Sequence, residues 1–190
     1  YFKVRLRIIS RLAGYLGFQK GYISSLRLDN GNMSFMYYNK TNFNDSRIQK
    51  WDMSQATNMW GMFYKAHAFN QNIERWNVHR VTNMRSMFNT AKVFNQNLKW
   101  NVSNVTDMRY MFTKAYAFNQ NIGDWDTGKV ENMRAMFYKA YSFNQNIGDW
   151  DTGKVENMRS MFNSARRFDR DLSIWNVSNV TDMSFMFYTA

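Results

Sequence analysis

The sequence of 190 residues contains no cysteine and no proline. Without cysteine there is no disulfide framework, no thiolate nucleophile and no cysteine-based metal site. No uninterrupted apolar run approaches the ~20 residues that a transmembrane helix needs. The first residues do not follow the charged, apolar and small-residue order of a signal peptide. Apolar residues make up 45% of the sequence and aromatic residues 18%. This is enough to build a hydrophobic core without disulfide bonds.

Positive charge exceeds negative charge, and the excess is unevenly spread. The formal net charge is +11. Residues 1–50 contain nine Lys or Arg against two Asp, whereas residues 51–190 contain sixteen against twelve acidic residues. A basic surface attracts nucleic acid, anionic lipid or an acidic protein. The alternative is that these basic residues form a solvated surface that binds no partner.

A sequence repeat organises most of the chain. Residues 118–142 and 143–167 are tandem copies whose first 17 residues are identical. Tryptophan recurs every 24 or 25 residues, at Trp51, Trp76, Trp100, Trp125, Trp150 and Trp175. A fixed period of this size indicates a solenoid of stacked supersecondary units.

One half of each copy has the hydrophobic spacing of a helix. Its apolar positions are spaced 3, 3, 1, 3 and 3 residues apart, at Val130, Met133, Met136, Phe137, Ala140 and Phe143. This spacing predicts one buried face of an α-helix. A threonine next to Asn or Asp stands where a helix N-cap belongs, at Thr57, Thr82, Thr106 and Thr181. We therefore expect one helix in each copy.

The other half of each copy has the spacing of a leucine-rich repeat. Ile122, Trp125, Thr127 and Val130 stand at offsets 0, 3, 5 and 8. The alternation predicts a short strand whose Trp125 and Thr127 side chains point inward. We therefore predict an α/β repeat solenoid, leucine-rich-repeat-like, with one short parallel strand and one helix per ~25-residue repeat.

The same patterns divide the chain into two regions. Residues 1–32 form a basic, non-repeat N-terminal cap or arm, and residues 33–190 form a repeat solenoid of about six copies. In the copy that holds Leu98 and Trp100 one residue is missing, so we expect a shortened turn or a bulge there. After Ala190 no polar capping copy follows, so we expect the natural chain to continue or a partner to stack on this end.

The repeated string F-N-Q-N-I-x-x-W-[DN]-[VT]-x-x-V-x-[ND]-M-x-x-M-F resembles the BspA-like repeat family, also called DUF285. The resemblance covers residues 33–190. It implies a leucine-rich-repeat-like solenoid that is displayed on a cell surface or outside the cell and is used in adhesion. It implies no enzymatic activity. The alternative is a structural subunit of a large assembly, a virion or a ribonucleoprotein, that is held by its basic surface.

The residue types that carry chemistry do not form a catalytic arrangement in the sequence. His67 and His79 fall at different phases of the repeat, and no nucleophile or carboxylate is placed to be oriented by them. Paired aspartates at Asp124, Asp126 and their counterparts in the next copy could offer oxygen ligands to Ca²⁺, but their spacing matches no known calcium loop. We expect no enzymatic activity, no metal and no cofactor.

Two candidate binding surfaces follow from the repeat. The first, the stripe, consists of the residues that stand between the inward positions of the predicted strands. The stripe contains Lys50, Asp52, Arg75, Asn77, His79, Lys99, Asn101, Asp124, Asp126, Asp149, Asp151 and Asn176. It is basic in the early copies and acidic in the later ones, so we expect it to bind a protein partner or a glycan.

The second surface, the Arg ridge, has one arginine per copy on the predicted helix, at Arg85, Arg109, Arg134 and Arg159. A ridge of this charge would bind an anionic surface, or nucleic acid within a large assembly. The basic segment from Phe2 to Arg11 is the candidate that remains if neither surface binds.

Overall fold

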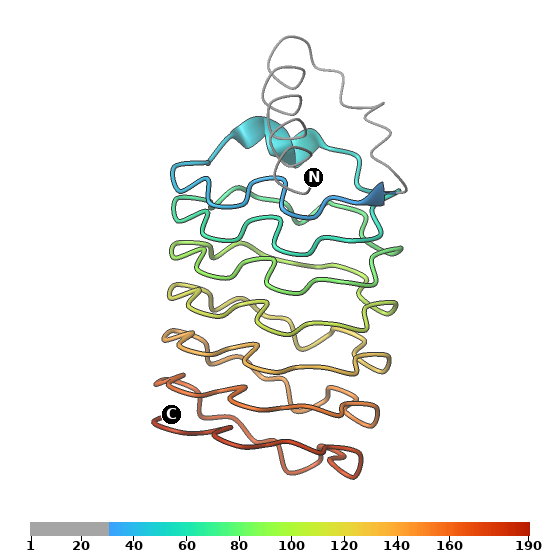
Figure 1. Cartoon of the computed structure of the whole chain (residues 1–190), viewed down its shortest axis with the longest axis vertical. Coiled ribbons are helices and arrows are strands. Elements are labelled where there is room, and N and C mark those ends of the chain that lie inside the picture. The colour runs from blue at the N-terminus through green and yellow to red at the C-terminus, as the bar shows by residue number, and fades with distance from the viewer. Residues whose placement is uncertain (1–30) are drawn as a thin grey trace, which may run out of the picture.

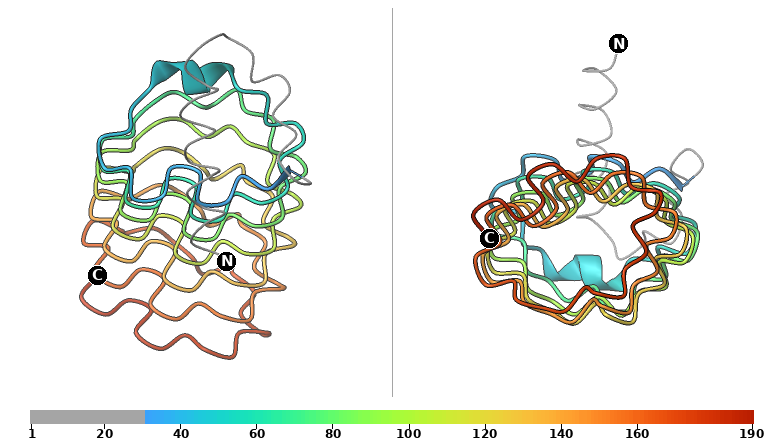
Figure 2. Two further views of the ribbon diagram at one scale, coloured as in Figure 1. Left: turned by 45° about the horizontal axis from the view of Figure 1, so that its top comes forward. Right: turned by 90° about the horizontal axis from the view of Figure 1, so that it is seen from below.

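The computed structural model describes residues 31–190, which form a stack of coils along one axis (Figure 1). Seen along that axis, the coils superpose on one oval outline with two long sides (Figure 2). The one helix that lies wholly within residues 31–190 is the 3-10 helix η2, Ser46–Lys50, in the first described coil. The predicted N-terminal cap or arm falls almost entirely outside the described residues.

The segment for which the sequence predicts a helix is instead a run of tight turns. Every second N–H group crosses to the next coil, as from Phe137 to the Met161 carbonyl at 2.9 Å. The N–H groups between them bond to the carbonyl three residues back, as from Met136 to Met133 at 3.1 Å. An α-helix would bond every N–H four residues back. The helix prediction is wrong because half of these backbone donors are used between coils.

Left-handed backbone recurs at two positions of each run of turns, which an α-helix does not allow. The first file contains Phe35, Gly61, Ser86, Tyr110, Ala135, Ser160 and Phe185, and the second contains Asn39, Lys65, Thr90, Lys114, Lys139, Ser164 and Thr189. Gly61 also has a steric role, since a Cβ there would lie 2.7 Å from the Phe35 ring. The turns therefore depend on tertiary contacts that hold residues other than glycine in a costly conformation.

The predicted parallel sheet is also absent from residues 31–190. Where the sequence predicts a strand around Trp125 and Thr127, the chain has turns and extended links. Parallel pairing occurs as isolated bridges at the Asn or Asp position before each run of turns. The bridged residues are Asn32, Asn58, Asn83, Asp107, Asn132, Asn157 and Asp182. One bridge per coil does not make a sheet, so the predicted α/β solenoid with a strand and a helix in every repeat is wrong.

The predicted N-cap positions begin turns rather than helices. The Oδ1 atom of Asn83, which follows Thr82, accepts the N–H of Arg85 at 3.0 Å, and Asp107, which follows Thr106, does the same for Arg109. A short polar side chain that bonds the backbone two residues on forms an Asx turn. The preceding residue joins the coils through its backbone, as where Thr106 N–H donates to the Thr82 carbonyl at 2.8 Å. This junction fixes where each run of turns starts.

The core is a set of aromatic columns that run the length of the stack. Phe112, Phe137 and Phe162 stack on one another with centroids 5.6–5.7 Å apart, and each is fully buried. A second column packs against the first, with Phe143 only 4.0 Å from Phe137. Trp125 and Trp150 stack at 6.3 Å and are buried. The residues expected to form the core are therefore buried, although their backbone is not helical.

Each indole of the tryptophan column from Trp76 to Trp175 is also held by a hydrogen bond to the preceding coil. Trp125 Nε1 donates to the Leu98 carbonyl at 2.9 Å, and Trp150 Nε1 donates to the Ile122 carbonyl at 3.0 Å. In the copy that lacks a residue, Trp100 still donates to Ile73 at 3.0 Å. The missing residue shortens the turn without displacing the tryptophan column.

The F-N-Q-N motif forms a polar ladder at one corner of the coils. The Oδ1 atom of Asn119 accepts the Asn144 N–H at 2.8 Å and the Gln145 side-chain amide at 2.9 Å. Asn95 accepts the same pair of bonds from Asn119 and Gln120. The amide side chains satisfy backbone groups where the coil reverses direction. This ladder gives a structural reason for Asn and Gln to recur after Phe69, Phe94, Phe118 and Phe143.

Candidate functional site

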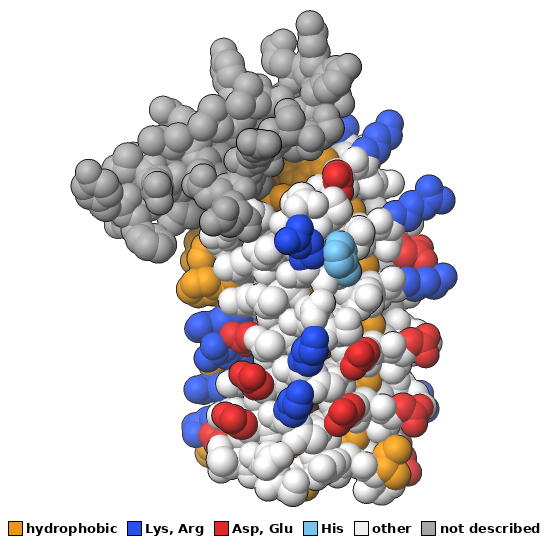
Figure 3. All heavy atoms as spheres, turned by 90° about the vertical axis from the view of Figure 1, so that its right-hand side faces the viewer, with side chains coloured by type: hydrophobic (Ala, Val, Ile, Leu, Met, Phe, Trp, Pro, Cys, Tyr) orange, Lys and Arg blue, Asp and Glu red, His pale blue; other side chains and the backbone are white. Residues whose placement is uncertain are grey.

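The stripe residues are exposed at equivalent places in successive coils, so the structure brings them onto one side of the stack. One file consists of Lys50, Arg75, Lys99, Asp124 and Asp149. The other consists of Asp52, Asn77, Asn101, Asp126, Asp151 and Asn176, with His79 next to it. Charged side chains of both signs lie over the coils on the face shown in Figure 3.

The second file of the stripe has a structural role that the sequence reading missed. The Oδ1 atom of Asp126 accepts the Gly128 N–H at 3.1 Å, and Asp151 accepts the Gly153 N–H at 2.9 Å. The asparagines in the same file do likewise, as from Ser103 to Asn101 at 3.1 Å. The signal was readable, because Asp or Asn two residues before Gly or Ser is typical of an Asx turn. These side chains fix the corner that presents the first file.

The first file changes sign along the stack. Lys99 Nζ lies 3.0 Å from Glu74 Oε1, and the Lys99 side chain is 77% exposed, so this ion pair contributes little to stability. Asp124 and Asp149 follow in the next two coils and are exposed. Lys129 stands nearby and donates to Asn104 Oδ1 at 2.7 Å. The file therefore presents cations to one end of the stack and carboxylates to the other.

The Arg ridge is also brought together by the fold. The backbone ladder connects its members directly, as from Ala135 N–H to the Arg159 carbonyl at 2.8 Å. Three guanidinium groups lie over aromatic rings: Arg85 over Trp60 at 5.0 Å, Arg134 over Tyr110 at 5.7 Å and Arg159 over Phe185 at 5.4 Å. Such stacking orients a guanidinium and leaves its N–H edge available to an acceptor. The ridge lies on a run of turns rather than on helices.

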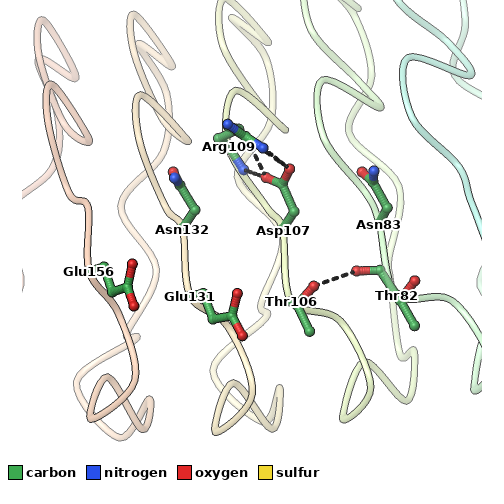
Figure 4. Close-up of a pocket in the computed structure, with 8 residues that line it drawn as sticks. All are labelled: Thr82, Asn83, Thr106, Asp107, Arg109, Glu131, Asn132 and Glu156. Atoms are coloured by element: carbon green, nitrogen blue, oxygen red, sulfur yellow. Dashed lines mark hydrogen bonds and ion pairs between the residues drawn. The ribbon is translucent and has the colours of Figure 1, made fainter. Parts of the chain in front are cut away.

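Arg109 differs from the other three arginines because a carboxylate neutralises it. Its Nε and Nη2 atoms lie 2.8 Å and 2.7 Å from Asp107 Oδ2. The Asp107 hydrogen bond raises the pKa of the Arg109 guanidinium. The pair lines a depression of about 350 Å³ in which Glu131 and Glu156 stand on the other side (Figure 4). No ridge cation other than Arg109 lines this depression.

A second set of cations on the same side escaped the sequence reading. Lys65, Lys114 and Lys139 form a file at the end of the runs of turns, and Lys92 and Arg166 stand beside it. Lys139 Nζ lies 5.2 Å above the Tyr138 ring, and a hydrogen bond with Tyr138 raises the pKa of this lysine. The signal was present, because a basic residue follows within four residues of every Met–Phe pair from Phe63 to Phe162.

Charge is partitioned between the two halves of each coil. We define the turn arc as the segment of each copy that ends at the phenylalanine of the F-N-Q-N motif or its counterpart, residues 33–43, 59–69, 84–94, 108–118, 133–143 and 158–168, together with 183–190. The turn arc contains eleven Lys or Arg and no Asp or Glu. The rest of residues 31–190, the connecting arc, contains eight Lys or Arg and thirteen Asp or Glu. Summed over residues 31–190, the turn arc is therefore cationic and the connecting arc is mixed and acidic overall.

The two histidines report on these two arcs. His67 lies on the turn arc, where partial burial and then the charges of Lys92 and Lys65 lower its pKa. His79 lies on the connecting arc, with Nδ1 2.7 Å from Asn77 Oδ1. Within residues 31–190 no three His, Cys, Asp or Glu side chains are grouped to hold a metal ion. The described surface thus consists of exposed files and a shallow polar depression.

Comparison with known proteins places the repeat in a family. A family model described as "Mycoplasma protein of unknown function, DUF285" matches residues 28–121 and 97–190. The chain belongs to the DUF285 family. Membership confirms the resemblance drawn from the repeated string, and the two matches overlap because the period continues through the whole array.

Other comparisons add little to the DUF285 assignment. The crystal structure of a leucine-rich repeat protein of T. pallidum, TpLRR, is similar over 64% of this chain and 65% of that one, with 7% identity and a TM-score of 0.34. A TM-score of this size does not establish a shared fold, and less than two thirds of that protein is covered. No curated protein matches the chain. None of the helices in residues 31–190 is long and apolar enough to cross a membrane.

Proposed function

We propose that this DUF285 chain is a non-enzymatic binding module that uses the stripe to bind a protein partner. The observation that carries the proposal is the exposed first file, which changes from Lys50, Arg75 and Lys99 to Asp124 and Asp149 along the axis. A partner with the opposite polarity would be steered onto the stripe and held in one register. Display on a cell surface or outside the cell belongs to the same proposal.

The rigidity of the scaffold supports this role. The aromatic columns and the backbone ladder hold successive coils in register, and the Asx turns of Asp126 and Asp151 fix the corners beside the file. A surface that is ordered before binding loses less conformational entropy in the complex. The large aromatic side chains are taken up by the core, which leaves recognition on the stripe to polar and charged groups.

The test changes the sign of the acidic half of the stripe. Reversing Asp124 and Asp149 to lysine leaves the Asx turns intact, because neither of these aspartates accepts the turn N–H groups of Gly128 and Gly153. The matched control reverses Glu131 and Glu156, which lie in the same copies but line the polar depression instead. Both variants change the net charge equally.

The partner is first captured with a photo-crosslinking residue at position 149 and identified, and its affinity is then measured for both variants. We expect the stripe variant to bind about tenfold more weakly and the control to bind as the parent does. Equal losses in the two variants, or no loss in the stripe variant, would show that the stripe is not the site.

The second candidate function, a structural subunit held in a large assembly, is favoured by the acid-free turn arc. A surface of one sign can lock onto an anionic scaffold by counterion release. Release of the chain from its native assembly by moderate salt, with the stripe variant still incorporated, would favour this role over the first.

A further inference from the structure

The turn arc has one ridge arginine in each of four consecutive coils, from Arg85 to Arg159. The backbone ladder joins consecutive runs of turns through bonds of 2.8–2.9 Å, as from Ala135 to Arg159 and from Phe137 to Met161. Parallel backbones joined in this way lie about 4.8 Å apart. Successive coils follow one another along the axis of the stack (Figure 1), so the Arg ridge repeats at this step over the four coils from Arg85 to Arg159. With no acidic residue in the turn arc, its attraction for anions is opposed only by carboxylates at its margins.

We propose that the turn arc is a second binding surface, separate from the stripe, and that it takes a linear anionic glycan laid along the axis of the stack. Sulfate and carboxylate groups on such a chain would accept hydrogen bonds from the Arg ridge and from the file of Lys65, Lys114 and Lys139. Guanidinium groups bind such anions with paired N–H donors, and lysines bind them as point charges. One anionic unit can be met by each coil.

The partly exposed tyrosine rings of the turn arc favour a glycan over single-stranded nucleic acid. Tyr38 stacks on Tyr64 and Tyr116 on Tyr141, both with centroids 4.9 Å apart. Arg166 lies 5.1 Å above the Tyr141 ring, on which Tyr116 also stacks. Proteins that bind single strands without sequence preference offer open aromatic faces on which bases stack. Here rings and cations cover faces that bases would need.

The arginines of the ridge are pre-positioned but only one is strongly neutralised. Arg109 is paired with Asp107, whereas Arg159 is 3.8 Å from Asp182, at the edge of ion-pair distance. Arg134 is exposed and stacks on Tyr110. The lowered pKa of His67, which partial burial and then Lys92 and Lys65 cause, is a second sign of positive potential on this side.

The first test uses the two histidines as site-resolved reporters on the unaltered full chain. Their pKa values are measured by NMR with and without a heparin-derived oligosaccharide. An anion bound beside Lys65 and Lys92 offsets their charge, so the pKa of His67 should rise. The pKa of His79, on the connecting arc, should stay unchanged. No change at His67 under saturating oligosaccharide, or equal changes at both histidines, would overturn the proposal.

The second test compares two triple variants of equal charge. Lys65→Gln, Arg134→Gln and Lys139→Gln remove three cations from the turn arc. Lys50→Gln, Arg75→Gln and Lys99→Gln remove three from the stripe. We expect the first set to weaken oligosaccharide binding about tenfold and to flatten its salt dependence, and the second to change it about twofold at most. Equal weakening of oligosaccharide binding in the two triple variants would mean that only net charge matters. No weakening in either variant would make the segment Phe2–Arg11 the remaining candidate. Both outcomes reject the turn arc as the binding surface.

A single-stranded oligonucleotide with the same number of charges decides between the two polyanions. The proposal expects it to bind the parent chain more weakly than the oligosaccharide does at the same salt concentration. Tighter binding of the oligonucleotide, lost in the turn-arc variant, would overturn the assignment to a glycan. The stripe variant with Asp124 and Asp149 reversed should still bind the oligosaccharide, which separates a failure of this proposal from a failure of protein binding.

Discussion

At the scale of single residues, each tryptophan from Trp76 to Trp175 in the column combines burial with one directed bond. Trp125 is 5% exposed, stacks on Trp150 and donates to the Leu98 carbonyl of the preceding coil. Burial alone would allow the ring to slide between coils, whereas the N–H bond selects one neighbour and one register. The tryptophan column therefore fixes the stacking as well as stabilising it.

Two substitutions at Trp125 separate these contributions. Trp125→Phe keeps most of the ring but leaves the Leu98 carbonyl without its donor, so we expect a loss of about 1–3 kcal/mol in the free energy of unfolding. Trp125→Ala also opens a cavity, and we expect a loss of about 3–5 kcal/mol. Urea unfolding measures both. Almost no loss in Trp125→Phe would mean that the hydrogen bond adds nothing to the packing.

Because of the Asx turns, the free energy of unfolding depends on pH in the acid range. Hydrogen bonds from Ser54 lower the pKa of Asp52, and those from Ser173 lower the pKa of Asp171. The folded pKa values therefore lie below the unfolded value of about 3.9. Their stabilising effect is complete above that value and is lost as the pH falls through the folded pKa values.

Asparagine at both positions keeps an oxygen acceptor but does not titrate. We expect the Asp52→Asn, Asp171→Asn variant to lose less stability than the parent when the pH is lowered from 5 to 3. The difference is small because both side chains are exposed to solvent. Thermal unfolding across that range checks it, and an unchanged pH profile would show that these turns do not contribute.

At the scale of elements, the run of turns is the unit that builds the fold. It holds the backbone in an unfavourable conformation at fixed positions, among them Thr90, which has a φ of 62°. A β-branched residue is disfavoured in this region, and only the ladder to the next coil holds it there, through the Thr90 N–H to Thr113 carbonyl bond of 2.7 Å. The ladder thus determines the local conformation against the preference of the residue.

This conformation gives glycine opposite effects at adjacent positions. Thr90→Gly should raise the free energy of unfolding by about 1 kcal/mol, because glycine adopts positive φ without strain. Ala91→Gly should lower it by about 1 kcal/mol, because glycine there only adds unfolded-state entropy and removes a buried methyl group. In a helix both changes would destabilise, so chemical denaturation of the two variants distinguishes the structures.

At the scale of the whole molecule, the chain is a one-dimensional stack in which each coil contacts its neighbours. The Phe, Trp and Asn columns all connect a residue to its counterpart one period away, as Phe137 to Phe162 and Asn144 to Asn119. Stability in such arrays is close to a sum over repeats and interfaces. A whole period can therefore be removed with its interfaces replaced by equivalent ones.

Deletion tests this directly. Removing residues 118–142 joins Ala117 to Phe143 and keeps every column in register. We expect the product to fold cooperatively. Its free energy of unfolding should be lower than that of the parent by the contribution of about one repeat and one interface. Removing residues 118–130, about half a period, displaces every later column and should abolish cooperative unfolding. Near-ultraviolet circular dichroism of the tryptophans follows both, and a folded half-period deletion would contradict the stacking.

The sequence determined the repeat and the core by itself. The tryptophan spacing predicts the stack, and in the inner coils the apolar columns through Met133, Phe137 and Trp125 are buried as the spacing predicts, because burial there follows the period whatever the backbone does. The Arg ridge could be predicted for the same reason, since Arg134 and Arg159 occupy one position of the period. The absence of Asp and Glu from the turn arc can also be seen in the sequence. That the turn arc lies on one side of the stack follows only from the path of the backbone in the structure.

The tertiary structure decided what each backbone donor binds. A spacing of 3, 3, 1, 3 and 3 fits both an α-helix and successive turns of three residues, so the positions of Met136 and Phe137 could not distinguish them. The neighbouring coil made the difference, since it offers carbonyls such as that of Met161 to every second N–H. Those inter-coil bonds compensate for the energetic cost of the positive φ at Ala135, a conformation that an isolated chain segment would avoid. No local property of the sequence specifies a partner that lies one whole coil away.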